Sequence, residues 1–249
     1  MRKMHLHLTN ILLKKELYSY FTSPLPYLLA CIFIFLLGWN FFHSLVTSKE
    51  DQMVSLSNSV IIPIFGNINF LFLFIAPLLT MRSFAEEKRD QTIELLFTSS
   101  LTDLEIIVAK YLAVISVTLF ILLFTTIFPI ILALSGYNDW PIIFSNYLGT
   151  IINIACYLAV GILISSCTQN QILSALISFA LLVFLLLLAH SSNIISNFSL
   201  GQMVAYLSLS NHLWAFSAGA INSSDLIYYF SFIIFIIFLT HRSLSRRKW

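Results

Sequence analysis

The chain has 249 residues, of which 59% are hydrophobic and only 10% are charged, with a formal net charge of +2 and a mean hydropathy of +0.91. Soluble domains carry about 25% charged residues, so this composition excludes a water-soluble globular protein. The near-neutral charge also argues against a polyanion-binding protein, and no nucleic-acid partner is expected.

Residues 140–224 contain no Asp, Glu, Lys or Arg. Most of this stretch must lie in lipid, where backbone groups are satisfied only within helices or closed barrels. The apolar runs are continuous rather than alternating, which favours helices. The expected fold is therefore an all-α membrane protein, with residues 1–249 forming a single transmembrane domain. Cys31, Cys156 and Cys167 fall inside apolar runs and are expected to pack as small hydrophobic side chains.

Residues 5–22 mix apolar residues with charges, and they are predicted to form an amphipathic helix along the membrane interface. Its polar and aromatic positions are Lys14, Lys15, Glu16, Tyr18 and Phe21. Crossing ~30 Å of hydrocarbon takes ~20 helical residues, and six spans of suitable composition follow. They cover residues 25–46, 61–81, 104–134, 143–167, 172–190 and 225–241. The segment 191–224 is predicted to form short interfacial or re-entrant helices on the outer side.

Basic residues predict the orientation of these spans. Twelve of the 13 Lys and Arg residues lie in the N-terminal segment, in residues 82–110 or in the C-terminal tail, and only Lys49 lies elsewhere. By the positive-inside rule, both termini and the loop 82–103 are then cytoplasmic. We expect a multi-pass protein of the cell (inner or plasma) membrane.

No catalytic, cofactor-binding or metal-ligating pattern is present in the sequence. None of the seven glycines precedes a Lys-Ser or Lys-Thr pair, so no phosphate-binding loop is expected. The predicted span interiors lack the ionisable residues that usually mark ion paths. We therefore expect no enzymatic activity on this chain. Polar residues within the spans are interpreted as helix-packing groups rather than ligand contacts: Asn153, Ser165, Ser166, Ser174 and Ser178.

Residues 82–103 form the densest polar segment and contain two capping-box spacings, Ser83 with Glu86 and Thr102 with Glu105. The first predicts a helix over about residues 84–97, and the second predicts the start of the third span. The predicted helix combines six charged residues with an apolar end at residues 95–97. Spacing alone leaves two interpretations open, a solvated connection or a helix that inserts into a partner.

The run 77–89, Pro-Leu-Leu-Thr-Met-Arg-Ser-Phe-Ala-Glu-Glu-Lys-Arg, is followed by Thr-Ile-Glu-Leu-Leu at 92–96 and Lys-Tyr at 110–111. These runs resemble ABC-2 type permeases, the membrane subunits of ATP-binding-cassette exporters. The chain is most similar to the branch that includes gliding-motility and copper-enzyme-maturation permeases. Residues 15–21 and the last third of the chain extend the resemblance. Gln91 stands where relatives commonly have Gly, and Ser100 where they commonly have Pro.

The resemblance implies a permease that forms a translocation path with a second copy. A separate cytoplasmic ATPase would carry ATP and Mg, so no cofactor is expected on this chain, and membrane lipid would surround it. The resemblance implies a coupling helix between the second and third spans. The residues that it assigns to coupling with the ATPase are Arg82, Glu86, Glu87, Lys88, Thr92, Glu94, Leu95, Leu96, Phe97 and Lys110.

Two alternatives stay open from the sequence. The chain could be a membrane anchor or mechanotransmitting subunit of an ATP-driven envelope machine that moves no solute. It could also be an ATP-independent channel or a structural membrane protein.

Overall fold

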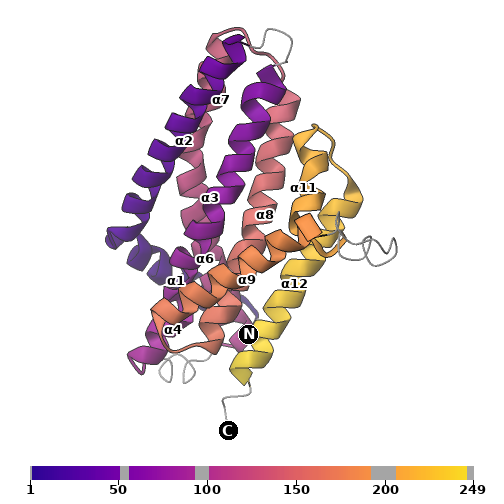
Figure 1. Cartoon of the computed structure of the whole chain (residues 1–249). Helices are drawn as coiled ribbons and strands as arrows, with labels where there is room; N and C mark the ends of the chain where they lie inside the picture. The colour runs from indigo at the N-terminus through magenta and orange to yellow at the C-terminus, as the bar shows by residue number, and fades with distance from the viewer. Residues whose placement is uncertain (1, 51–55, 93–100, 192–205, 246–249) are drawn as a thin grey trace.

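The computed structural model describes residues 2–50, 56–92, 101–191 and 206–245, and every element in that part of the chain is a helix (Figure 1). In chain order these are α1 (Arg2–Thr22), α2 (Leu25–Glu50), α3 (Ile62–Thr80), α4 (Arg82–Arg89), α6 (Asp103–Leu123), α7 (Ile127–Leu134), α8 (Trp140–Cys167), α9 (Gln171–Ser191), α11 (Leu209–Ser217) and α12 (Ser223–Ser245). A π-helical turn, η1 (Ser57–Ile61), leads into α3, and a 3₁₀ turn, η2 (Phe124–Thr126), joins α6 to α7.

Within the described residues, six stretches are long and apolar enough to cross a membrane, which agrees with the predicted number of spans. They consist of α2, η1 with α3 and α4, α6 with η2 and α7, α8, α9 and α12. The second stretch is longer than predicted, because only Met81 separates α3 from α4 and the helix runs on to Arg89. Helix α12 also extends beyond the predicted 225–241 at both ends. The limits of the predicted spans were placed at charged residues. The helices continue past these residues because backbone hydrogen bonding does not stop where the apolar segment ends.

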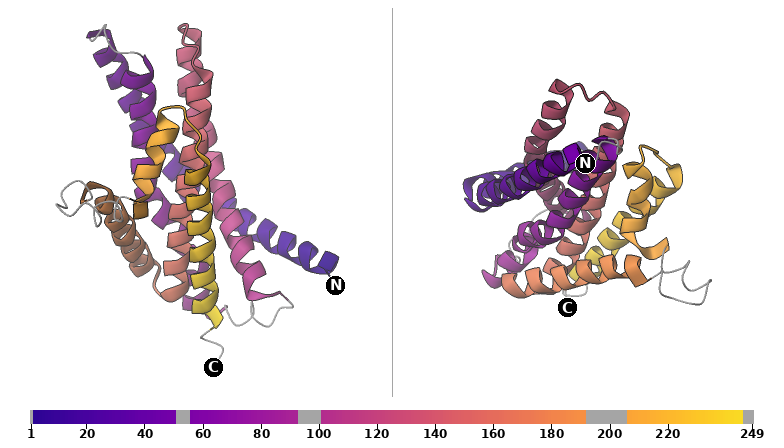
Figure 2. Two further views of the ribbon diagram at one scale, coloured as in Figure 1. Left: turned by 90° about the vertical axis from the view of Figure 1, so that its right-hand side faces the viewer. Right: turned by 45° about the horizontal axis from the view of Figure 1, so that its top comes forward.

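Helix α8 occupies the centre of the bundle and packs against α3, α4, α6, α9, α11 and α12 (Figures 1 and 2). Pro141 lies in its first turn, where the missing N–H removes no helical hydrogen bond. The helix ends at Cys167 because Thr168 is extended. Its polar residues bond to neighbouring helices, as Asn153 Nδ2 does to Asn69 Oδ1 of α3 at 2.8 Å.

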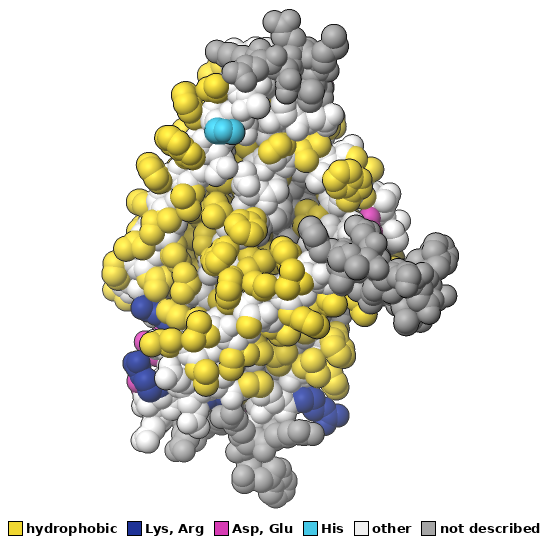
Figure 3. All heavy atoms as spheres, viewed as in Figure 1, with side chains coloured by type: hydrophobic (Ala, Val, Ile, Leu, Met, Phe, Trp, Pro, Cys, Tyr) yellow, Lys and Arg dark blue, Asp and Glu magenta, His cyan; other side chains and the backbone are white. Residues whose placement is uncertain are grey.

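The outer helices expose large apolar side chains. Phe35 of α2 is 73% exposed, Ile172 of α9 70% and Ile234 of α12 67%. Hydrophobic side chains cover much of the face in Figure 3, while Lys and Arg gather toward its lower part. An exposed apolar surface of this kind is characteristic of a membrane contact, and the separation of charge matches the predicted sorting of basic residues.

Helix α1 crosses the basic end of the bundle and projects sideways from it (Figure 2, left). It packs against α6, with Leu12 and Tyr20 buried and Tyr18 73% exposed. The helix predicted over residues 5–22 is thus confirmed as a helix. Its position in a lipid interface stays a prediction.

Helix α11 packs against α8, α9 and α12 toward the opposite end. His212 Nδ1 lies 2.6 Å from Asp225 Oδ1 of α12, and its Nε2 lies 3.0 Å from the Tyr206 carbonyl oxygen. The imidazole also stacks on Tyr228 with ring centroids 4.0 Å apart. These contacts hold α11 against the start of α12. Helix α11 is a short helix of the kind predicted for 191–224, whereas residues 192–205 lie outside the described part of the chain.

Two glycines let neighbouring helices approach α8 closely. A Cβ atom at Gly161 would lie 2.1 Å from Thr80 Oγ1 of α3, and one at Gly149 would lie 2.7 Å from Phe216 Cβ of α11. Both separations are far below van der Waals contact, so a larger residue would force the helices apart. Small residues serve the same purpose in membrane-helix interfaces generally.

We predict that Gly161→Ala destabilises the bundle by ~1–3 kcal/mol, the cost typical of an overpacked core. Gly66→Ala in α3 is the matched control, because a Cβ there meets nothing within 4 Å and alanine favours the helix. The free energy of unfolding, measured by denaturant titration in detergent micelles, should fall only for the first variant. Equal values for the two would contradict the close packing of α3 on α8.

Candidate functional site

Helix α4 carries most of the described charges of residues 82–103 and begins as a continuation of α3. The predicted Ser83–Glu86 capping box is wrong, since the N-cap is Met81 in helical conformation without a side-chain cap. No cap is needed there, because Met81 N donates to Pro77 O at 2.9 Å and continues the α3 hydrogen bonding. The Thr102–Glu105 capping box is confirmed at the start of α6.

The predicted helix over 84–97 is also wrong in length, because α4 ends at Arg89. A turn follows, in which Thr92 N donates to Glu87 O at 2.9 Å. Gln91 has a φ of 58°, in the left-handed region that glycine adopts freely and other residues adopt at a cost of roughly 1–2 kcal/mol. A right-handed helix cannot continue through this residue. Glu94, Leu95, Leu96 and Phe97 lie outside the described residues.

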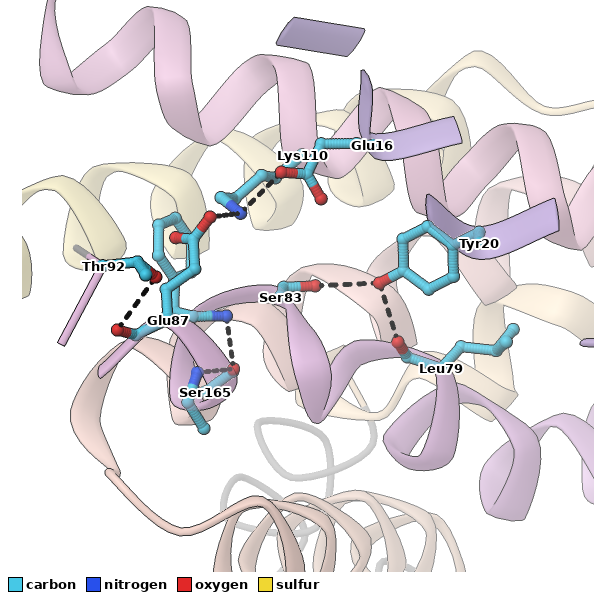
Figure 4. A network of polar contacts seen from close by, with 10 residues as sticks. Glu16, Tyr20, Leu79, Ser83, Glu87, Thr92, Lys110 and Ser165 are labelled. Atoms are coloured by element: carbon cyan, nitrogen blue, oxygen red, sulfur yellow. Dashed lines mark hydrogen bonds and ion pairs between the residues drawn. The ribbon is translucent and has the colours of Figure 1, made fainter. Parts of the chain in front are cut away.

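Lys110 of α6 lies at the centre of the site (Figure 4). Its Nζ atom is 2.9 Å from Glu16 Oε1 of α1 and 2.7 Å from Glu87 Oε1 of α4. The same atom lies 5.2 Å from the centroid of the Phe84 ring. We call Glu16, Lys110 and Glu87 the Lys110 triad. It joins three helices from separate parts of the chain.

The charges of the Lys110 triad depend on one another. The lysine side chain is only 2% exposed, and a buried ammonium is retained only where its charge and its N–H donors are compensated. Two carboxylates accept hydrogen bonds from it, and the face of Phe84 adds a cation–π contact. Glu87 Oε2 is itself buried without a hydrogen-bond partner among the described residues. Without the lysine, two like charges would share a poorly hydrated space.

Tyr20 of α1 forms a second connection, to the joint between α3 and α4 (Figure 4). Its hydroxyl donates to Leu79 O at 3.0 Å and lies 3.3 Å from Ser83 Oγ. Burial raises the pKa of Tyr20, so the hydroxyl keeps its proton and remains a donor. Beside it, Arg82 Nη1 donates to Ser23 Oγ at 3.0 Å. The end of α1 is therefore fastened to the start of α4.

Ser165 and Ser166, at the end of α8, form the third connection. Ser165 Oγ accepts from Phe84 N at 3.0 Å and from Ala85 N at 3.1 Å, and it donates to Met81 O at 3.3 Å. Lys88 Nζ donates to the carbonyl oxygen of Ser166. These bonds tie the backbone at the start of α4 to the end of α8. They confirm that Ser165 acts as a helix-packing group, because its hydroxyl bonds to the backbone of a neighbouring helix.

The predicted site residues divide into an internal and an external group. Glu16, Glu87 and Lys110 pair with one another inside the chain. The other side chains are exposed at Lys14, Lys15, Tyr18 and Thr92 and half-buried at Phe21, Arg82, Glu86 and Lys88. Arg82 and Lys88 also donate to Ser23 and Ser166 within the chain. Arg89, which sequence reasoning did not assign, is 58% exposed on α4 beside Asp90.

Sequence reasoning also missed Tyr20 and the partner of Ser165. Tyr20 follows Glu16 by four residues, a spacing that places both on one face of α1, and that signal was available. Ser165 and the α4 amides are about 80 residues apart. No local pattern could pair them.

Six apolar spans and an all-helical described fold define a multi-pass α-helical membrane protein. A family model described as "ABC-2 family transporter protein" matches residues 10–239. The chain therefore belongs to the ABC-2 family, and it is a membrane subunit of an ABC transporter that associates with a cytoplasmic ABC ATPase. No curated protein matches the chain. The matched residues include all members of the Lys110 triad.

We predict that Lys110→Met destabilises the protein by about 3–5 kcal/mol, the usual cost of removing one partner from a buried ion pair. Adding Glu16→Gln and Glu87→Gln should recover most of this loss, because no uncompensated charge then remains. Thermal unfolding in detergent, followed by circular dichroism, measures both effects. Lys14→Met, which removes an exposed lysine of α1, is the control. A Lys110→Met protein as stable as this control would contradict the role of the triad.

Proposed function

We propose that the chain is the permease subunit of an ATP-binding-cassette exporter. Together with a second copy it forms the translocation path, and α4 and α1 receive the movement of the cytoplasmic ATPase. The observation that supports this coupling is the Lys110 triad. Because Lys110 belongs to a span and its two carboxylate partners belong to α1 and α4, a force on either of these helices reaches the bundle directly.

A second route runs through α8. The bonds from Ser165 to the α4 backbone link α4 to the most buried helix, and only Met81 lies between α4 and α3. A displacement of α4 then moves α3, α6 and α8 together. Nucleotide-driven closure of the ATPase would bias this packed assembly between two arrangements, as rigid-body switches do.

In this mechanism, one group of residues contacts the ATPase and another transmits its movement to the bundle. The contact group consists of the exposed part of α4 around Arg89, the following turn with Thr92, and residues 94–97, whose apolar side chains would enter a cleft of the partner. Glu87 and Lys110 belong to the transmitting group, because they are occupied within the chain.

We also propose that the basic end faces the cytoplasm, with both termini on that side of the cell membrane. The support is the gathering of Lys and Arg toward one end in Figure 3, since cytoplasmic connections are enriched in these residues.

We predict that Arg89→Glu and Leu96→Asp each reduce the ATPase retained by the permease at least tenfold. The first reverses an exposed charge and leaves the Lys110 triad intact, and the second places a charge in the apolar segment. The measurement is the molar ratio of ATPase to permease after affinity purification of the co-expressed pair, together with the ATPase activity of the purified complex.

Ser224→Asp is the control for this experiment, because Ser224 is exposed at the start of α12, toward the end of the bundle opposite α4. It should retain the ATPase at the wild-type ratio. Wild-type retention by both α4-side variants would remove the proposed contact surface.

Orientation is tested by labelling with a membrane-impermeant maleimide on intact cells. Cys31 and Cys167 are first replaced by Ser, while Cys156 is buried and remains. Arg89→Cys and Asn222→Cys then place single thiols at exposed positions toward opposite ends. We expect labelling at residue 222 and not at 89 until the cells are permeabilised. The reverse pattern would contradict the proposed orientation.

A further inference from the structure

A polar cavity of about 260 Å³ lies where α1 meets α4. Its wall includes the side chains of Glu16, Ser19, Thr22, Ser23, Arg82 and Glu86. Tyr20 lines it as well, and its hydroxyl points toward Ser83 (Figure 4). The cavity is smaller than the roughly 300–1,000 Å³ pockets that hold drug-sized ligands. It suits a small charged group.

The cavity carries both signs of charge. Arg82 Nη1 donates to Ser23, but Arg82 Nε is buried with no hydrogen-bond partner among the described residues. A guanidinium has five N–H donors in a fork that matches a phosphate, so Arg82 has donors to spare. Ser19 and Ser23 line the same cavity, and the Ser23 hydroxyl is the acceptor for Arg82.

Carboxylates supply the opposite charge. Glu86 lines the cavity and forms no ion pair within 4 Å in the described part of the chain. Glu16 lines it as well and uses Oε1 for Lys110. A ligand that carried only negative charge would meet these carboxylates unfavourably. A ligand that carries a phosphate and an ammonium satisfies the whole wall.

The side chains around the cavity are of the kind found at a membrane–water interface. Tyr18 and Tyr27 are 73% and 45% exposed on the two helices that meet beside it, and exposed tyrosines mark the membrane–water interface. Tyr27 donates to the carbonyl oxygen of Phe21 at 3.0 Å, which fixes the α1–α2 corner next to the cavity. Helix α2 then enters the apolar band.

We propose that this cavity binds the headgroup of a phosphoethanolamine lipid from the surrounding leaflet. The phosphate is held by Arg82 with Ser19 and Ser23, and the ammonium is held by Glu86 with Glu16. The lipid acts as a spacer between α1 and α4 beside the Lys110 triad. This site does not require the ATPase, so its failure would leave the proposed function intact.

The test is native mass spectrometry of the full-length chain in detergent, titrated with phosphatidylethanolamine, phosphatidylglycerol or phosphatidylcholine of identical acyl chains. We expect one phosphatidylethanolamine adduct with a dissociation constant at least tenfold below those of the other two lipids. Phosphatidylglycerol lacks the cation, and the trimethylated amine of phosphatidylcholine has no N–H donors for the carboxylates. Equal affinity for phosphatidylglycerol would overturn the proposal.

Variants separate the two halves of the site. Arg82→Gln should weaken the phosphatidylethanolamine adduct at least tenfold, and Glu86→Gln should remove the preference over phosphatidylglycerol. Arg89→Gln, which removes a charge from the same helix outside the cavity, should change neither value. An unchanged dissociation constant for the phosphatidylethanolamine adduct in Arg82→Gln would contradict the proposed phosphate contact.

A steric variant tests the site without changing any charge, so the proposal can still be tested if the charge variants misfold. Ser19→Trp fills the cavity from an exposed position on α1 and leaves every charge in place, whereas Tyr18→Trp inserts the same residue one position earlier, outside the wall. We expect loss of the lipid adduct only in the first. Soluble O-phosphoethanolamine should compete only at far higher concentration than the lipid. Binding as tight as the lipid's would assign the cavity to a free metabolite instead.

Discussion

One ammonium group joins the three helices that meet at the basic end of this protein. Lys110 is almost fully enclosed, and its charge is stable there only because Glu16 and Glu87 approach it from two other helices. Helix α4 continues the hydrogen bonding of α3 across Met81. Its position is fixed by Glu87, which pairs with Lys110 of α6, and by the Ser165 hydrogen bonds from α8.

The remaining polar contacts of this end follow from the same constraint. Near a membrane, backbone groups without a partner are costly, and α4 begins where the apolar span ends. Ser165 supplies the acceptor for two of its amides, and the Tyr20 hydroxyl bonds to the last turn of α3. Each of these bonds also fixes one helix relative to another. These hydrogen bonds therefore satisfy backbone groups and also hold the helices in a rigid assembly.

The sequence was sufficient for the number, type and approximate limits of the spans, because lipid imposes length and composition on every one of them. It was also sufficient for the Thr102–Glu105 cap, whose signal lies within four residues. The length of α4 was predicted wrongly, because Gln91 itself gives no sign of the left-handed conformation that it adopts. The neighbouring Asp90 and Thr92 are weak helix formers, but neither marks the residue at which the helix ends. The partners of Lys110 and Ser165 could not be predicted at all. They lie as far as 94 residues away, and only the packed bundle brings them together.

The position of Ser165 has a consequence for the length of α8. Toward one end this helix accepts Phe216 against Gly149, and at the other Ser165 holds the start of α4. The two contacts are set at a fixed rotation about the same axis, and each added or deleted residue would turn one against the other by about 100°. Helix α8 thus sets both the distance and the rotation between these two contacts, and a change in its residue count would prevent both from forming in their present geometry.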